Sequence, residues 1–284
     1  MKKLFSGYYS EDLSFDLLKK SVIVISYEVL CSLYCMPIET AKQLIRCIAE
    51  IKEQLWLPYI IAEKYHRMSN IVIDRYFNRL QDVLMKIVHA KEALDAIPYT
   101  VEHRDWFNAT SDCVASALRR RMVEVRGNIK KKSVIKNQIA CVFEYKVGQD
   151  NSDPAPESFD IFQYKVKDTA APIVSEPSNN NEGNYEQRLL HSLIDLSKSK
   201  DKNIVYITST LSAELSLVIN KTSYGLKPEI STYFSKKTQG HQLFCITFWT
   251  FLSLLKSYGI GVPASSLSFV KKLTYEADNT VDNV

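Results

Sequence analysis

A serine stands where this sequence would be expected to offer a charged side chain. Residues 22–25 are four β-branched residues in a row, which is typical of a short strand buried on both faces in a parallel sheet. In such sheets, ligands and reactions lie just beyond the carboxyl ends of the strands. Ser26 occupies that position, and its hydroxyl lacks the charge that acid-base or metal chemistry would need there.

The cysteines and histidines do not predict a metal site. The six cysteines include no CxxC pair, and the five histidines are scattered along the chain. Cys31 and Cys35 would share a helix face at a spacing of four residues, which ordinary core packing accounts for. We therefore expect reduced, buried thiols and no zinc site.

Composition favours a folded protein without a membrane anchor. The 284 residues are 46% hydrophobic, and the net charge of +4 permits contact with nucleic acid without demanding it. The first residues lack the apolar core of a signal peptide, and no later apolar run approaches the roughly 20 residues of a membrane span. We expect a cytoplasmic protein with no membrane contact.

Apolar periodicity predicts an α/β fold in which a parallel β-sheet is covered by helices. The chain should form a single domain, 1–284, with a mainly helical insertion at 70–147. The Pro-, Asn- and Ser-rich residues 148–184 should be a flexible connection within that domain. Besides 22–25, the sequence predicts strands at 203–208 and 241–247, an extended segment at 55–61, and helices at 37–55, 62–97, 105–125, 185–200, 227–238 and 248–258.

Four segments carry a resemblance to the PIN-like nuclease domain family. "VIVISYEVLCSLY" resembles the family's first strand and its Asp-Thr-Asn motif, and "LWLPYIIAEKYHRM" resembles the apolar-Pro segment before Glu-Phe-His-Arg. "NIVYITSTLSAEL" is similar to a strand that ends in Thr-Asp-Asp, and "GLKPEISTYFSKKTQGHQLFCITFWTFLSLL" is similar to the closing helix, strand and helix. The resemblance implies a ribonuclease fold in which carboxylates at strand ends hold Mg²⁺ or Mn²⁺.

Position by position, the resemblance implies that this chain has lost the metal-binding acids. Ser26 replaces the first Asp, Lys64 the Glu of the second segment, and Asn184 the Asp that should follow Gly183. Ser209 and Thr210 replace the two Asp of the later strand. Neutral oxygens bind a hard divalent ion weakly and an ammonium repels it, so we expect a degenerate site that holds no cofactor.

Three nearby acids keep a divergent metal-dependent ribonuclease open as an alternative, with Mg²⁺ or Mn²⁺ as its cofactor. They are Glu28, Glu63 and Glu214. Glu28 lies two residues beyond the strand and should have left its tip. Glu63 precedes Lys64 in a helix, where one residue turns the side chain by about 100°, so it should point away from the direction of Lys64.

A basic stretch at 119–136 leaves a second alternative, a nucleic-acid-binding module. It carries eight basic residues against the single acid Glu124. Such a stretch could contact phosphates, although basic residues also favour the solvated carboxyl end of a helix. The candidate contacts are Arg119, Arg120, Arg121, Arg126, Lys130, Lys131 and Lys132.

We expect a catalytically inactive pseudo-nuclease that serves as a binding or regulatory scaffold. A fold that has lost its chemistry must act through its surfaces, so a protein partner is expected, and a homo-oligomer is compatible with the sequence. The resemblance suggests a bacterial toxin-antitoxin or antiviral (phage-defence) setting. The sequence does not identify the partner.

Overall fold

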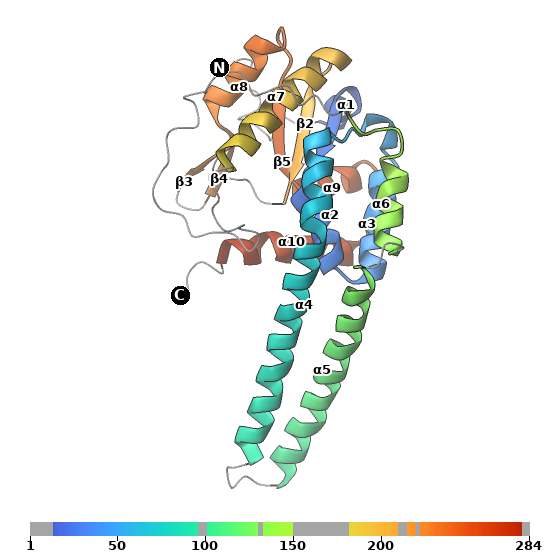
Figure 1. The fold of residues 1–284 in the computed structure, drawn as a ribbon, viewed down its shortest axis with the longest axis vertical. Helices are drawn as coiled ribbons and strands as arrows, with labels where there is room; N and C mark the ends of the chain where they lie inside the picture. The colour runs from blue at the N-terminus through green and yellow to red at the C-terminus, as the bar shows by residue number, and fades with distance from the viewer. Residues whose placement is uncertain are drawn as a thin grey trace.

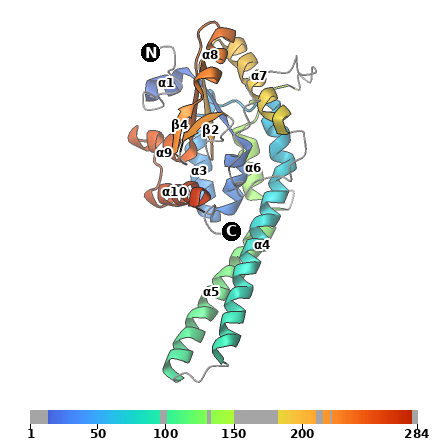
Figure 2. The same cartoon turned by 90° about the vertical axis from the view of Figure 1, so that its left-hand side faces the viewer.

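The protein was studied as a computed structural model, which describes residues 14–95, 101–129, 133–149, 182–209, 215–219 and 222–279. In the described part, a body built on a small sheet carries a long helical hairpin that projects from one end (Figure 1). The view turned by 90° shows the same two-part shape (Figure 2).

A three-stranded parallel sheet forms the centre of the body. Its strands are β1 (Val22–Ile25), β2 (Ile204–Thr208) and β5 (Leu243–Thr247), in the order β1-β2-β5. Each strand consists almost entirely of buried residues, as expected for short apolar runs in a parallel sheet. Because all three strands run in the same direction, their carboxyl ends meet at one edge of the sheet.

Helices surround this sheet and bury it (Figures 1 and 2). A two-stranded antiparallel sheet lies beside them, formed by β3 (Ser216–Ile219) and β4 (Thr222–Leu226). The helices of the body are α1 (Phe15–Lys20), α2 (Tyr27–Ser32), α3 (Ile38–Ala49), α6 (Val134–Val142), α7 (Glu182–Lys200), α8 (Pro228–Lys237), α9 (Phe248–Ser257) and α10 (Ala264–Asn279), with short 3-10 helices at Leu33–Cys35 and Lys52–Gln54.

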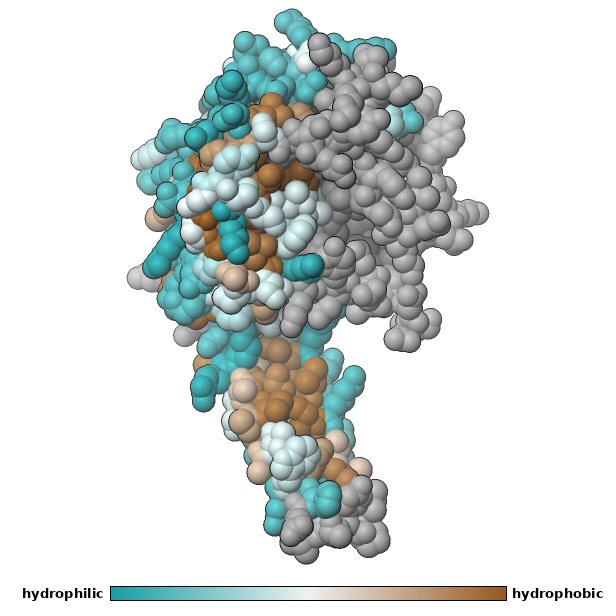
Figure 3. All heavy atoms as spheres, turned by 180° about the vertical axis from the view of Figure 1, so that it is seen from behind, coloured by the Kyte–Doolittle hydropathy of each residue, from teal (hydrophilic) through white to brown (hydrophobic). Residues whose placement is uncertain are grey.

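The projecting hairpin consists of α4 (Tyr59–Asp95) and α5 (Val101–Gly127). The buried side chains of α4 all lie between Ile60 and Phe77, so the first half of this helix belongs to the body. Farther out, the two helices rest mainly on each other, and Lys91 Nζ contacts Asp112 Oδ1 at 2.7 Å between them. Apolar side chains also show along the stem of the hairpin in the view from behind (Figure 3).

The structure confirms the predicted fold class, a parallel sheet covered by helices with a helical insertion. The helix predicted at 37–55 is shorter, because α3 ends at Ala49 and the chain reaches an extended segment at Leu55 after one 3-10 turn. Leu55 forms an isolated parallel bridge with Ile23 and Leu57 forms one with Val147, in place of a full strand at 55–61. None of the described helices combines the length and the apolarity that a membrane span requires.

The predicted connection at 148–184 lies largely outside the described residues, which resume at Glu182. At that residue α7 begins, three positions before the helix predicted from residue 185. The division of the chain into one domain with an insertion stays a prediction.

Candidate functional site

Three hydroxyl side chains mark the carboxyl edge of the sheet. Ser26 directly follows β1, Ser209 directly follows β2, and Thr247 is the last residue of β5. The backbone N–H of Ser26 donates to Ile207 O at 2.8 Å, which ties the end of β1 to the end of β2. The structure therefore brings two of the predicted positions, Ser26 and Ser209, to the same edge.

Two of these hydroxyls start helices. Ser26 is the N-cap of α2, and its Oγ accepts a hydrogen bond from Val29 N at 3.4 Å. Thr247 is the N-cap of α9, and its Oγ1 accepts from Thr250 N at 3.1 Å. An N-cap oxygen satisfies a backbone N–H that has no partner within the helix, so both side chains have a structural task at the edge.

Lys64 of α4 points into the same region and is 8% exposed. Its Nζ lies 3.8 Å from the ring centroid of Tyr185 and 4.8 Å from that of Tyr27. The two rings meet edge to face, with centroids 5.9 Å apart. Tyr27 directly follows Ser26, and Tyr185 directly follows Asn184. The ammonium group therefore contacts two tyrosines, each of which directly follows a predicted site position in the sequence.

Glu28 lies at this edge, so the expectation that it had left the strand tip was wrong. It occupies the first turn of α2, two residues after the N-cap Ser26, and the helix therefore holds it near the end of β1. Burial raises the pKa of its carboxyl group, and the side chains of Ser26 and Tyr27 and the charge of Lys64 offset this only in part. Its Oε2 is buried and has no hydrogen-bond partner among the described residues.

Aromatic residues make up much of the site, and no sequence motif had indicated them. Burial, reinforced by the negative charges of Glu28 and Glu186, raises the pKa of Tyr27, Tyr185 and Tyr206. Their phenols therefore stay neutral at physiological pH. The sequence did contain one indication of these tyrosines: Tyr27 and Tyr185 each directly follow a position at which the resemblance placed an acid.

The remaining predicted positions are only partly described. Glu63 is exposed while its neighbour Lys64 is buried, which confirms that the two side chains point in different directions. Asn184 lies in α7, where only its backbone is described. Thr210 and Glu214 fall outside the described residues.

The described residues do not fit a Mg²⁺ or Mn²⁺ centre. They contain no group of three or more His, Cys, Asp or Glu side chains that could hold a metal ion. Such hard ions require several oxygen ligands, whereas Ser26 caps a helix here and Lys64 brings a positive charge. Glu28 and Glu186, whose charges act on the same tyrosines, are two potential ligands and fall short of such a group.

The basic stretch separates into exposed and engaged residues. Arg119, Arg120 and Arg126 are exposed on α5, although Arg126 lies over the ring of Phe77, 4.2 Å from its centroid. Arg121 is largely covered and donates to the backbone oxygens of residues 34 and 36. Lys130, Lys131 and Lys132 lie outside the described residues.

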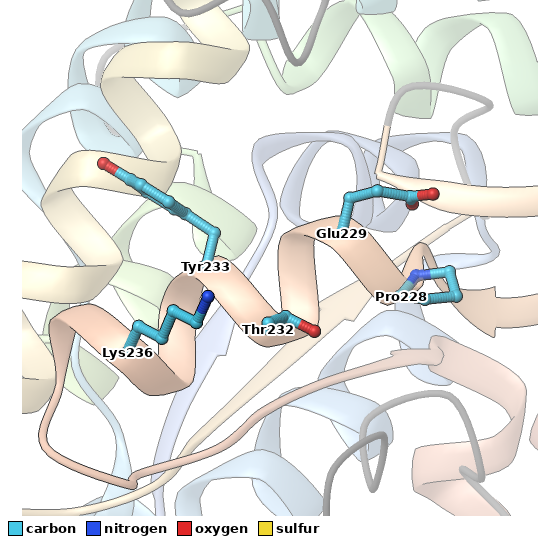
Figure 4. A pocket seen from close by; sticks show the side chains of 5 residues that line it. All are labelled: Pro228, Glu229, Thr232, Tyr233 and Lys236. Carbon is cyan, nitrogen blue, oxygen red and sulfur yellow. The ribbon is translucent and has the colours of Figure 1, made fainter.

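A shallow hollow of about 430 Å³ runs along α8, and none of the described residues that line it belongs to the group around Lys64 (Figure 4). A single helix lines it, with Glu229, Thr232, Tyr233 and Lys236 among its side chains. Burial raises the pKa of Tyr233, which keeps its hydroxyl neutral. This lining does not combine the groups that a reaction would need, and we assign it no role.

Comparison with known proteins identifies a family for this chain. Neither the comparison with curated proteins nor that with solved structures gave a match. A family model described as "PIN like domain" matches residues 22–210, which run from β1 through the hairpin to just beyond β2. Because this match covers more than half of the 284 residues, the chain belongs to the PIN-like domain family.

Proposed function

We propose that this PIN-like protein is a binding or regulatory scaffold that does not cleave nucleic acid. The supporting observation is the composition of the carboxyl edge, where Ser26 caps a helix and Lys64 places an ammonium between two tyrosine rings. Metal-dependent cleavage needs carboxylates that hold the ion, activate water and neutralise charge on the phosphodiester. The described residues of this edge supply no such set.

Lys64 opposes metal binding directly. Two like unit charges about 4 Å apart repel each other by on the order of 4 kcal/mol at an effective dielectric of about 20, and a divalent ion would be repelled more strongly. Glu28 offers only a weak counterweight to this repulsion, because burial raises the pKa of its carboxyl group, and Glu186 is the one further acid that acts on the tyrosines beside Lys64 among the described residues. The proposal therefore includes the absence of a metal cofactor.

We predict that the purified full-length protein leaves RNA and single-stranded DNA intact in the presence of millimolar Mg²⁺ or Mn²⁺. Cleavage should be followed on labelled substrates over long incubations, with an EDTA-treated sample as the blank. Glu28→Gln and Glu214→Ala are the informative variants. Activity that EDTA and either variant abolish would establish the divergent nuclease and overturn the scaffold proposal.

A nucleic-acid-binding module is the second candidate, and the exposure of Arg119 and Arg120 on the projecting α5 favours it. Both are exposed on α5, the second helix of the projecting hairpin (Figure 1), one and two residues before Arg121 at the end that meets the body, and a phosphate backbone could reach their side chains there. Arg121 is a poorer candidate for such contact because its guanidinium already holds backbone oxygens of the body. The structure thus changes which residues a test should remove.

If this module binds nucleic acid, five substitutions to alanine at Arg119, Arg120, Lys130, Lys131 and Lys132 should weaken binding to all sequences alike. The salt dependence should also flatten, by about 0.9 in the slope of log K against log [salt] for each duplex phosphate that the variant no longer neutralises. Fluorescence anisotropy at several salt concentrations measures both effects. The matched control removes five exposed lysines elsewhere, at Lys20, Lys86, Lys202, Lys236 and Lys256. Equal losses in both variants, or no binding by the wild type at low salt, would reject this candidate.

We place the proposed scaffold in the cytoplasm, where a protein partner would meet it. All six cysteines are free thiols, which fits a reducing compartment. The expectation that they are buried holds for Cys31, Cys47 and Cys245 and was wrong for Cys113 and Cys141, which are exposed on surface helices. The family resemblance suggests a bacterial toxin-antitoxin or phage-defence setting, and self-association is compatible with the proposal.

A further inference from the structure

The immediate surroundings of Lys64 are those of a bound cation. Its Nζ lies 3.8 Å and 4.8 Å from the ring centroids of Tyr185 and Tyr27, within the range at which the negative face of an aromatic ring attracts an ammonium. Lysine is rarely buried to 8% exposure unless its charge is matched. We infer that the Lys64 ammonium is a built-in cation that occupies the place of a divalent metal ion at the carboxyl edge of the sheet.

The placement rests on where its partners come from. Tyr27 begins α2 directly after β1, and Tyr185 lies in α7 directly after position 184. Glu28, one residue farther along α2, feels the positive charge of Lys64, although no direct ion pair joins them. The first turns of α2 and α7, far apart in the sequence, thus converge on the ammonium group that α4 carries.

Acidic side chains close to the ammonium agree with a cation at this place. Glu28 and Glu186 lie near enough to raise the pKa of Tyr27 and Tyr185, and the charge of Lys64 acts on Glu28. Glu28 Oε2 has no hydrogen-bond partner among the described residues, so its carboxyl group depends on this electrostatic environment.

The inference goes beyond the proposed function, because it concerns what holds the edge together and not what the protein binds. It predicts that fold stability depends on a positive charge at position 64 and not on divalent metal. Cleavage of nucleic acid would overturn the scaffold proposal. The experiments below test the built-in cation separately, through stability alone.

The decisive experiment is chemical rescue of Lys64→Ala in the full chain. Losing one member of a buried charge cluster should lower Tm by about 10 °C, whereas the exposed control Lys86→Ala should leave Tm nearly unchanged. The truncation leaves a space between two rings, and n-propylammonium should bind there and recover part of the loss. Sodium chloride at equal ionic strength and n-propanol should not. Equal recovery with n-propanol would show that only volume was missing, and an undiminished Tm in Lys64→Ala would also overturn the inference.

A second variant keeps the test open if Lys64→Ala fails to fold. Lys64→Met keeps an unbranched side chain as far as the position of Cε and removes the ammonium group. Its loss in Tm should be smaller in a Glu28→Gln background, because a neutral amide needs no nearby cation. Strictly additive losses would contradict the inference. So would a rise in the Tm of the wild type with Mn²⁺ that Glu28→Gln abolishes, since that would show that the edge binds a divalent ion despite Lys64.

Discussion

Placing acids at Ser26, Lys64, Asn184 and Ser209 together should make the stability of this protein depend on divalent metal. Ser26 and Ser209 follow adjacent strands, and Lys64 lies between the neighbours of positions 26 and 184. Four carboxylates gathered there without the ammonium should repel one another, raise some of their own pKa values and destabilise the fold. This is the largest effect we expect.

Thermal melting of Ser26→Asp, Lys64→Glu, Asn184→Asp and Ser209→Asp, combined in one chain, measures it. The apo variant should melt well below the wild type, and added Mn²⁺ should raise its Tm. A ligand that binds only the folded state at a hundredfold excess over Kd contributes about 2.7 kcal/mol. The wild type should ignore the metal, as should a control that carries the four acids at exposed positions of the hairpin. A quadruple variant that melts like the wild type with or without Mn²⁺ would show that the four side chains do not converge.

Removing the guanidinium of Arg121 should loosen the attachment of the hairpin to the body. Its Nη2 donates to Tyr34 O at 3.4 Å and to Met36 O, and its Nη1 contacts Glu124 Oε2 at 2.8 Å. The side chain is only 15% exposed, so Arg121→Met would leave two backbone oxygens without a donor in a place that water reaches poorly. We expect a loss of about 2–3 kcal/mol in the free energy of unfolding.

Urea denaturation gives the size of this loss, and hydrogen exchange gives its location. Exchange should accelerate in the last turns of α5 and in the 3-10 helix Leu33–Cys35, because Arg121 joins these two segments. Arg120→Met is the matched control, since Arg120 is exposed on the same helix and its loss should cost less than about 0.5 kcal/mol. Equal stability of the two variants would mean that Arg121 does not anchor the hairpin.

The sheet could be predicted from sequence because its strands are short apolar runs that local pattern identifies. Residues 22–25, 204–208 and 243–247 all lie within predicted strands, and Phe248, Phe251 and Leu252 form the buried side of α9. The antiparallel pair β3 and β4 did not stand out, since "SLVI" and "TSYGL" lack a long β-branched or alternating run. Its pairing depends on contacts within the folded body.

The sequence predicted some residues of the candidate site, but it could not predict the contacts between residues that lie far apart in the chain. The position after β1 identified Ser26, and the family resemblance identified Lys64. No local pattern could show that Lys64 reaches Tyr27 and Tyr185, because these residues are separated by 37 and 121 positions along the chain. The position of Glu28 was predicted wrongly for a related reason. We expected two residues of chain to carry it away from the end of β1, whereas α2 starts at once and its first turn stays at the edge of the sheet.

The hydroxyl cap at Ser26 also bears on how such a site could be lost or regained during evolution. Aspartate and serine are about equally good N-caps, so either residue can start α2 with a side-chain oxygen that accepts from Val29 N. An exchange between them would change the chemistry of the edge and leave the local fold almost untouched. Selection for folding alone therefore does not distinguish aspartate from serine at this one position, whereas an exchange at Lys64 would also disturb its contacts with Tyr27 and Tyr185.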